Sequence, residues 1–277
     1  MSEALYPPPR PLSVGEVLDL SFRIYRRTFV KCLVFGGLVV VANWLPNLYA
    51  IARGQTVVQS MVKPVTDVPH VLILIVSLLL AFVFPVAIIY RQYRMVTGQE
   101  VGGELLRALR LLGRIILILI LYALLTLACG LLIVPAFLTT GLTRYLLVAV
   151  LLLPLCYVLL RLTSAFTAMV IEDTSASGSL ARSWELSGGS VGRLTAIYTV
   201  AVFLLVVLYI VIGSLTAFLY AVLGKGDVAL IAAGIGVVTV AAGALASPYY
   251  SALGLAVFGD LLVRKEGADL SQRISAS

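Results

Sequence analysis

The residues of this chain that could do chemistry are charged side chains within or beside long apolar runs. Arg161 is a basic residue deep inside one such run, residues 145–171. A charge within a membrane-length segment is costly and marks a candidate site for an ion, a lipid or a substrate. Alternatively, the long side chain reaches the headgroups at the membrane surface. The acids that could pair with it are Glu172, Asp173, Glu185 and Asp260.

Glu172 and Asp173 are adjacent acids at the end of the same run. Paired carboxylates can bind a cation or relay protons, but a helix end in polar solvent also gathers acids without forming a site. Arg182, Arg264 and Lys265 could bind a lipid phosphate. An ordinary cluster of basic residues on the cytoplasmic side explains these three equally well.

The residue combinations typical of catalytic and metal sites are not found in this sequence. Its one histidine, His70, lies beside a polar loop, and Cys32, Cys129 and Cys156 lie in apolar runs without metal-ligand or redox spacing. We see no nucleophile–base pair, phosphate-binding loop or zinc spacing. We therefore predict that the protein is not an enzyme and has no catalytic residue, metal or cofactor.

The elements that must position the charged residues are membrane helices. The chain has 277 residues, of which 61% are hydrophobic and 12% charged, whereas soluble domains have about 25% charged residues. Apolar runs of about 18 residues or more predict transmembrane helices. We predict an all-α integral membrane protein with six spans, at residues 29–51, 71–90, 115–138, 145–171, 194–223 and 228–263.

The distribution of basic residues predicts the topology of the six spans. One side carries 15 of the 20 basic residues and the other carries 4, with Arg161 inside a span. Basic loops stay in the cytoplasm, so both termini are expected there. The net charge of +7 then favours anionic headgroups as partners rather than nucleic acid. The 15 are Arg10, Arg23, Arg26, Arg27, Lys31, Arg91, Arg94, Arg107, Arg110, Arg114, Arg182, Arg193, Arg264, Lys265 and Arg273; the 4 are Arg53, Lys63, Arg144 and Lys225.

The two ends of the chain and its last apolar run call for separate predictions. Residues 1–12 are proline-rich and are expected to form a solvated tail, with a partner-binding arm as the alternative; residues 271–277 form a second tail, and residues 13–270 a single six-span domain. The run 228–263 would be about 54 Å long as one helix, longer than the roughly 30 Å hydrocarbon core. We expect it to bend or break near Ser247–Pro248 and to finish as an interfacial helix.

Three amphipathic segments with basic residues, at 13–27, 98–114 and 172–193, each precede a pair of apolar runs. Ser13 and Glu16 have the spacing of a capping box at the start of the first segment. Residues 16–24, 103–111 and 178–186 align without gaps, which predicts a threefold repeat over residues 13–97, 98–172 and 173–263. Each segment is either an elbow that fixes the entry of a span or an interfacial helix that contacts lipid or a partner. The candidate contact residues are Arg23, Arg26, Arg27, Arg107, Arg110, Arg182, Arg264 and Lys265.

Three blocks of the sequence resemble a known family. They are RPLSVGEVLDLSFRIYRRTF at 10–29, IEDTSASGSLARSWELSGGSVGRL at 171–194 and FGDLLVRKEGADL at 258–270. In this order and spacing they resemble the glycerophosphoryl diester phosphodiesterase membrane-domain family and related uncharacterised six-span proteins of bacteria and archaea. The third block departs from the family pattern at Gly259, Leu262 and Ala268, where Tyr, Arg and an aromatic residue are common.

The resemblance implies a module of the prokaryotic cytoplasmic membrane. In some members this region is fused to a phosphodiesterase domain, which we do not find in this chain, so phosphodiesterase activity is not implied. We expect a non-enzymatic protein that acts in membrane, lipid or envelope homeostasis through anionic lipids or through a membrane or cytosolic protein partner. The alternative is a transporter component with a site near Arg161 among the proline-interrupted second, fourth and sixth spans.

Overall fold

The computed structural model describes residues 6–276 except 56–66, 135, 137–138 and 224–227, and every regular element in this part of the chain is a helix. Side chains are described for these residues apart from 129, 132–133, 220, 223, 228–237, 239–240 and 268–276. The helices are α1 (Val14–Ala52), α3 (Val68–Thr97), α4 (Glu104–Arg110), α5 (Leu112–Ile133), α6 (Gly141–Arg161), α7 (Ala165–Ile171), α8 (Ala176–Ser187), α9 (Val191–Leu223) and α10 (Val228–Ala276).

The predicted membrane class is confirmed by the length and composition of these helices. Five are long and apolar enough to cross a membrane, or six if α4 and α5, which meet at a bend of 56°, count as one span. Span four is divided, because α6 ends at Arg161 and α7 begins at Ala165. Residues 162–164 between them form a turn, in which the Thr163 hydroxyl donates to the Leu160 carbonyl at 2.8 Å.

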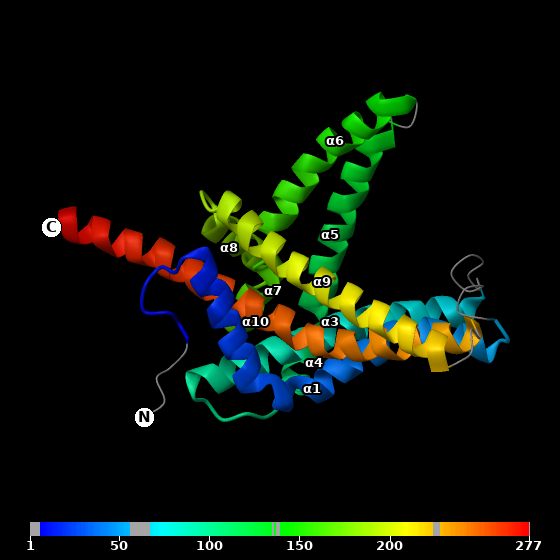
Figure 1. Ribbon diagram of the computed structural model, residues 1–277. Helices are drawn as coiled ribbons and strands as arrows, with labels where there is room; N and C mark the ends of the chain where they lie inside the picture. Colours follow the sequence, from blue (N-terminus) through cyan, green and yellow to red (C-terminus); the bar gives the residue numbers. More distant parts are fainter. Residues whose placement is uncertain (1–5, 56–66, 135, 137–138, 224–227, 277) are drawn as a thin grey trace.

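The start of α1 has the predicted capping box. The Ser13 hydroxyl accepts from the Glu16 amide at 3.3 Å, and the Glu16 carboxylate accepts from the Ser13 amide at 2.6 Å. The amphipathic segment then continues into span one without a break, so the expected elbow is a single helix of 39 residues. Figure 1 shows this helix, in blue, changing direction along its length. The Thr28 hydroxyl donates back to the Ile24 carbonyl at 2.8 Å, an interaction that often bends helices.

The last apolar run is expected to bend or break near Ser247–Pro248, and the structure shows no break there. Helix α10 continues through Pro248 to Ala276, so residues 271–276 are helical as well. Proline cannot donate to the carbonyl four residues earlier, which here is Ala244. That oxygen faces Gly36 of α1, where a Cβ would lie only 2.3 Å away. Neighbouring helices therefore accommodate the proline, as is common in membrane helices.

Two clusters of buried side chains form the core. One joins the first half of α1 to α9 and to residues 246–261 of α10, and includes Val17, Ile24, Leu253 and Phe258. The other joins the middle of α1 to the second half of α3, to α4 and α5, and to α7. Buried Gln92 links three helices, because its amide donates to the Thr28 hydroxyl at 3.3 Å and to the Pro248 carbonyl at 2.8 Å.

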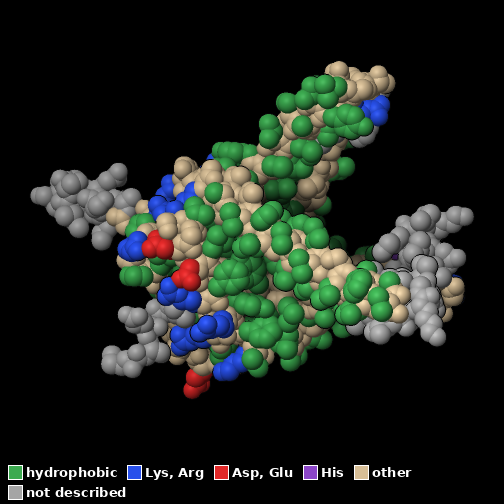
Figure 2. Space-filling model, in the orientation of Figure 1, with side chains coloured by type: hydrophobic (Ala, Val, Ile, Leu, Met, Phe, Trp, Pro, Cys, Tyr) green, Lys and Arg blue, Asp and Glu red, His purple; other side chains and the backbone are tan. Residues whose placement is uncertain are grey.

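The helices are arranged in two arms that share a charged base. Figure 1 shows the α5–α6 hairpin leaving this base in a different direction from α1, α3, α9 and α10. None of the described residues of α6 is buried. On the face seen in Figure 2, basic and acidic side chains gather where α1 begins, while hydrophobic side chains cover both arms. An exposed apolar helix of this kind is stable where lipid surrounds it.

The described part of the N-terminal segment, residues 6–12, is not simply a solvated tail. Tyr6 is buried and its ring meets that of Tyr93 edge-on at 5.7 Å. A Cβ on Gly259 of α10 would lie 2.6 Å from the Tyr6 ring and 3.1 Å from Pro8. Glycine at 259 therefore lets this segment lie directly on α10.

Candidate functional site

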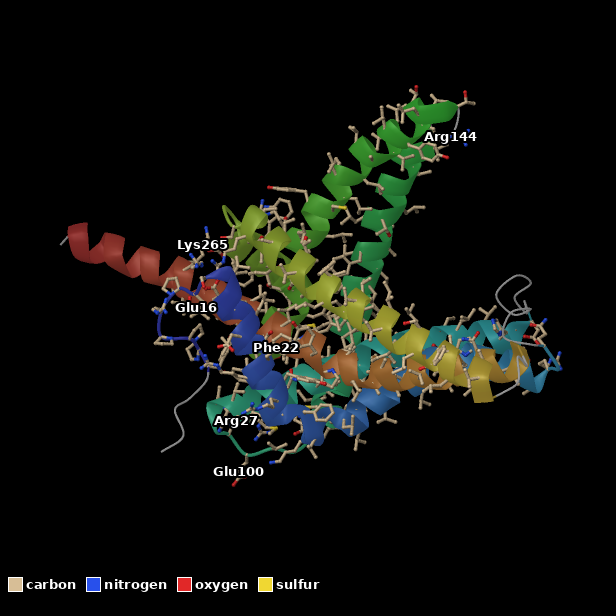
Figure 3. All side chains as sticks on the ribbon, viewed as in Figure 1. Glu16, Phe22, Arg27, Glu100, Arg144 and Lys265 are labelled. Carbon is tan, nitrogen blue, oxygen red and sulfur yellow. The ribbon has the colours of Figure 1, made fainter. Side chains whose placement is uncertain are left out.

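The charged base, called here the charged end, collects most of the residues singled out in the sequence. It consists of the first half of α1, the end of α3, α4, α7, α8, the start of α9 and α10 from Asp260 onward. Figure 3 shows Glu16, Arg27, Glu100 and Lys265 toward this end, and Arg144 at the tip of the α5–α6 hairpin. What the charged end can bind depends on which cations are already paired.

Asp260 is the centre of one buried ionic group. It is 1% exposed, and its carboxylate pairs with Arg193 of α9 at 2.9 Å and with Arg264 one turn later at 3.0 Å. The same carboxylate accepts from the Leu12 amide at 2.7 Å, and both arginines donate to the Leu12 carbonyl. A buried carboxylate with two cations and an amide is fully satisfied. This group therefore fastens the N-terminal segment to α9 and α10.

The adjacent acids Glu172 and Asp173 do not act as a pair, because the structure directs them to different arginines. Glu172 pairs with Arg182 at 3.1 Å, and Arg182 also pairs with Glu266 at 2.8 Å and Glu185 at 3.6 Å. Arg182 is therefore surrounded by carboxylates.

Asp173 pairs with Arg114 at 2.6 Å and with Arg107 at 3.1 Å, in a left-handed conformation with φ of 52°. The hydrogen bond from Arg114 holds the pKa of the Asp173 carboxyl below its usual value. Because Arg107 and Arg114 belong to α4 and α5, Asp173 fixes the bend between these helices.

Arg161 lies against α8, and none of its contacts in the described part of the chain is with a carboxylate. Its guanidinium stacks over the Trp184 ring at 3.7 Å from the centroid. It donates to the Trp184 carbonyl, to the Ser187 hydroxyl at 3.3 Å and to the Tyr157 hydroxyl at 3.3 Å. The acids proposed as its partners pair with other arginines. Stacking and neutral hydrogen bonds hold this cation in place.

Six cations of the charged end have no carboxylate within ion-pair distance among the described residues. Arg94 is half-buried, and the other five are exposed: Arg26, Arg27, Lys31, Arg110 and Lys265. Arg23 is exposed as well, but pairs with Asp19 through Nε at 2.9 Å. Arg26 and Arg27 are neighbours on α1, next to exposed Phe22. Free positive charge is therefore most concentrated on this part of α1.

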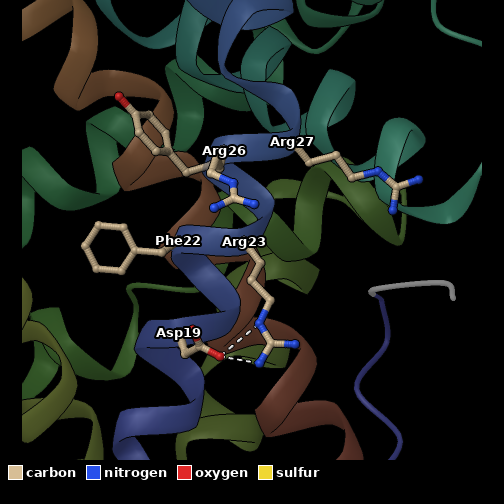
Figure 4. A pocket seen from close by; sticks show the side chains of 6 residues that line it. Asp19, Phe22, Arg23, Arg26 and Arg27 are labelled. Carbon is tan, nitrogen blue, oxygen red and sulfur yellow. Dashed lines mark hydrogen bonds and ion pairs between the residues drawn. The ribbon is translucent and has the colours of Figure 1, made fainter. Parts of the chain in front are cut away.

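Two depressions adjoin at Phe22 and Tyr25. One is open and is formed by residues 19–27 of α1, among them Arg23, Arg26 and Arg27. Figure 4 shows the Arg26 side chain between Phe22 and Arg27, and the ion pair of Arg23 with Asp19. The other is an apolar groove of about 270 Å³ between α1, α9 and α10, lined by Phe22, Tyr25, Leu204, Leu205, Leu208, Tyr209, Ile212, Ala242, Leu245, Ala246 and Tyr249.

A separate cavity of about 300 Å³ lies between α3, α10 and the break that separates α6 from α7. It is lined by Pro85 of α3, by Thr163 in the break between α6 and α7, and by Tyr250 and Ser251 just after Pro248 of α10. Thr167 and Tyr198 add two further hydroxyl groups. The residues that line it carry no formal charge, so it suits a neutral polar group.

Some residues of the charged end are missed by sequence reasoning. Glu104 is buried and pairs with Arg91 at 3.2 Å, and Arg91 donates to the Lys31 carbonyl at 2.6 Å. Arg193 holds Asp260, from which it is separated by 67 residues. A glutamine between arginines, as at Gln92 in RQYR, is the one local signal that this region is packed rather than solvated. Within the described residues no group of histidine, cysteine, aspartate and glutamate could hold a metal ion.

Comparison of the chain with family models, curated proteins and solved structures found no match. The resemblance to the phosphodiesterase membrane-domain family therefore stays a prediction. What can be said about function comes from the site itself.

Proposed function

We propose that this protein is a non-enzymatic membrane module that binds anionic lipid headgroups at its charged end. The single observation that carries the proposal is the sorting of the cations. Carboxylates neutralise Arg91, Arg107, Arg114, Arg182, Arg193 and Arg264, whereas Arg26 and Arg27 are exposed beside aromatic side chains. Unpaired arginines near aromatic residues are typical of helices at the surface of anionic membranes.

The proposal places the charged end at the cytoplasmic surface of a prokaryotic inner membrane. It is supported by the charge bias of the sequence and by the position of Arg144. The sequence assigns Arg144 to the side with few basic residues, and it lies at the tip of the α5–α6 hairpin, far from the charged end (Figure 3). The role that follows is in membrane, lipid or envelope homeostasis, with a membrane or cytosolic protein as a further partner.

The threefold repeat is part of the same proposal, and burial at the aligned positions supports it. Ser21, Ala108 and Ser183 occupy one aligned position, and each is 0% exposed. The next position is bulky and exposed in all three copies: Phe22 46%, Leu109 46% and Trp184 40%. Each copy thus buries a small side chain against the protein and leaves a large one partly exposed at the next position.

Lipid-dependent thermal stability tests the proposal. A lipid that binds the folded protein raises its unfolding temperature, so phosphatidylglycerol in mixed micelles should stabilise the purified protein more than phosphatidylcholine does. The difference should shrink with added salt and in Arg26→Gln/Arg27→Gln. Arg53→Gln is the control, because it removes a charge beyond the other end of α1. Equal stabilisation by both lipids in the wild type would refute the proposal.

A transporter component is the second candidate function, and the cavity beside the break between α6 and α7 favours it. Pro85 of α3, the break near Thr163, and residues just after Pro248 of α10 all border this cavity. A membrane helix that is interrupted beside a cavity is typical of transport sites. If the cavity holds water, Thr167→Cys should react with a water-soluble thiol reagent much faster than the native cysteines do. Leu204→Cys, on the exposed face of α9, should react no faster than the native cysteines. Equal protection of both positions would contradict the transporter function.

A further inference from the structure

We propose that one anionic phospholipid binds in a defined site on α1, α9 and α10, with its phosphate on Arg26 and Arg27 and one acyl chain in the apolar groove. This inference rests on the proposed function and gives it a location, an orientation and a lipid class. It follows from the way the two depressions share Phe22 and Tyr25.

The phosphate end of the site has an excess of positive charge. Arg23, Arg26 and Arg27 face one acid, Asp19, which is already paired with Arg23. Arg26 and Arg27 therefore keep their donors free, and Arg26 lies beside Phe22 (Figure 4), a residue that also lines the groove. A guanidinium presents parallel N–H groups that match phosphate oxygens. A zwitterionic lipid offers the same phosphate, but its ammonium group would meet the same cations.

The aromatic wall between the two depressions is fixed by its own contacts. The rings of Phe22 and Tyr249 lie 4.9 Å apart, and Tyr25 meets Tyr249 edge-on at 5.9 Å. The Tyr25 hydroxyl donates to the Leu245 carbonyl at 3.1 Å, which ties α1 to α10. Because these rings hold one another, the groove is formed before a lipid arrives.

The groove leads away from the charged end into the apolar part of the molecule. On α9 its lining runs from Leu204 to Ile212, away from Arg193 at the start of the helix. On α10 it runs from Tyr249 back to Ala242, away from Asp260 and Arg264. A phospholipid with its phosphate at the surface would direct its chain the same way. The two parts of the site thus match the two parts of one lipid.

The groove determines position more than affinity. Inside a bilayer, an acyl chain that enters the groove leaves the acyl chains of other lipids, so its burial in the groove gives little hydrophobic gain. Selection between lipids must therefore come from the arginines, while the groove decides where the bound lipid sits and how long it stays. These two contributions can be separated by substitution.

The test measures lipid retained by the full-length protein after delipidation in detergent and incubation with phosphatidylglycerol or phosphatidylcholine. Leu208→Trp narrows the groove, and Ile210→Trp is the matched control on the same helix, exposed but outside the groove. We expect Leu208→Trp to lower retained phosphatidylglycerol at least threefold and Ile210→Trp to leave it unchanged. Arg26→Gln/Arg27→Gln should lower it at least fivefold without changing phosphatidylcholine.

The remaining outcomes separate the site from the general function. If both tryptophan variants retain lipid like the wild type while the arginine variant does not, the groove proposal is overturned and headgroup binding stands. If the wild type and all variants retain phosphatidylglycerol and phosphatidylcholine to the same extent, both proposals fail. Millimolar inorganic phosphate or glycerol phosphate should not displace the lipid, and full displacement would indicate a site for free phosphate instead. If Leu208→Trp lowers the unfolding temperature, the retention measurement is made instead with Ile212→Phe, which narrows the same groove.

Discussion

Two neighbouring glycines of α1 should respond in opposite directions to the same substitution. Gly36 and Gly37 follow one another in the first span, and only Gly36 faces α10 closely. A Cβ on Gly36 would lie 2.3 Å from the Ala244 carbonyl oxygen and 3.3 Å from Pro248 Cδ, whereas a Cβ on Gly37 would meet nothing within 4 Å. We predict that Gly36→Ala destabilises the protein and that Gly37→Ala stabilises it.

The magnitudes follow from two opposing effects. Alanine is favoured over glycine within a helix by about 1 kcal/mol, which both variants gain. Carbon and oxygen normally stay about 3.3 Å apart, so Gly36→Ala must move α1 and α10 apart by about 1 Å. Overpacking of this kind costs about 1–3 kcal/mol. The contact is with backbone, which cannot rotate away, and a shift would also stretch the bond from Gln92 to the Pro248 carbonyl. Gly36→Ala should therefore be about 1–3 kcal/mol less stable than Gly37→Ala.

Thermal unfolding of the two variants in the same detergent measures this difference directly. Soluble domains of 150–250 residues shift by about 2–4 °C for each kcal/mol, so a separation of several degrees is expected. An unfolding temperature for Gly36→Ala equal to or above that of Gly37→Ala would refute the close approach of α1 and α10. It would also remove the explanation for the uninterrupted helix at Pro248.

Three further substitutions test the charged end. Asp173→Asn removes the charge but keeps a residue type that tolerates positive φ. Because Arg114 lowers the pKa of Asp173 in the folded state, the wild type should be more stable than the variant at pH values above the ordinary carboxyl pKa. Thermal unfolding should show this difference in stability vanish as the pH falls through the lowered pKa. Asp260→Asn should destabilise the protein by about 2–4 kcal/mol and speed cleavage of residues 6–12 by a non-specific protease, since two half-buried arginines lose their buried counter-charge. Unchanged cleavage would contradict the fastening of that segment. Arg161→Lys should lower stability by about 1–2 kcal/mol in thermal unfolding, because lysine cannot stack on Trp184 and bond to three partners at once.

The sequence by itself determined the class of the protein and its local signals. Long apolar runs predict membrane helices whatever surrounds them, because a backbone in lipid must satisfy its own hydrogen bonds. Six runs were predicted, and the described residues contain five or six suitable helices. The capping box of Ser13 and Glu16 is also confirmed, because it depends only on two residues three positions apart in the sequence. The cytoplasmic orientation and the family resemblance stay predictions.

Only the tertiary structure decided which charged side chains form ion pairs within the protein and which stay unpaired. Adjacent Glu172 and Asp173 look like one pair, but they turn to arginines on different helices. Asp260 depends on Leu12 and Arg193, and no spacing rule connects residues 248 or 67 positions apart. The helix through Pro248 persists because Gly36, on another helix, leaves room for the unbonded carbonyl. Each of these outcomes depends on contacts between distant segments, whose balance of desolvation and pairing exists only once the helices are packed.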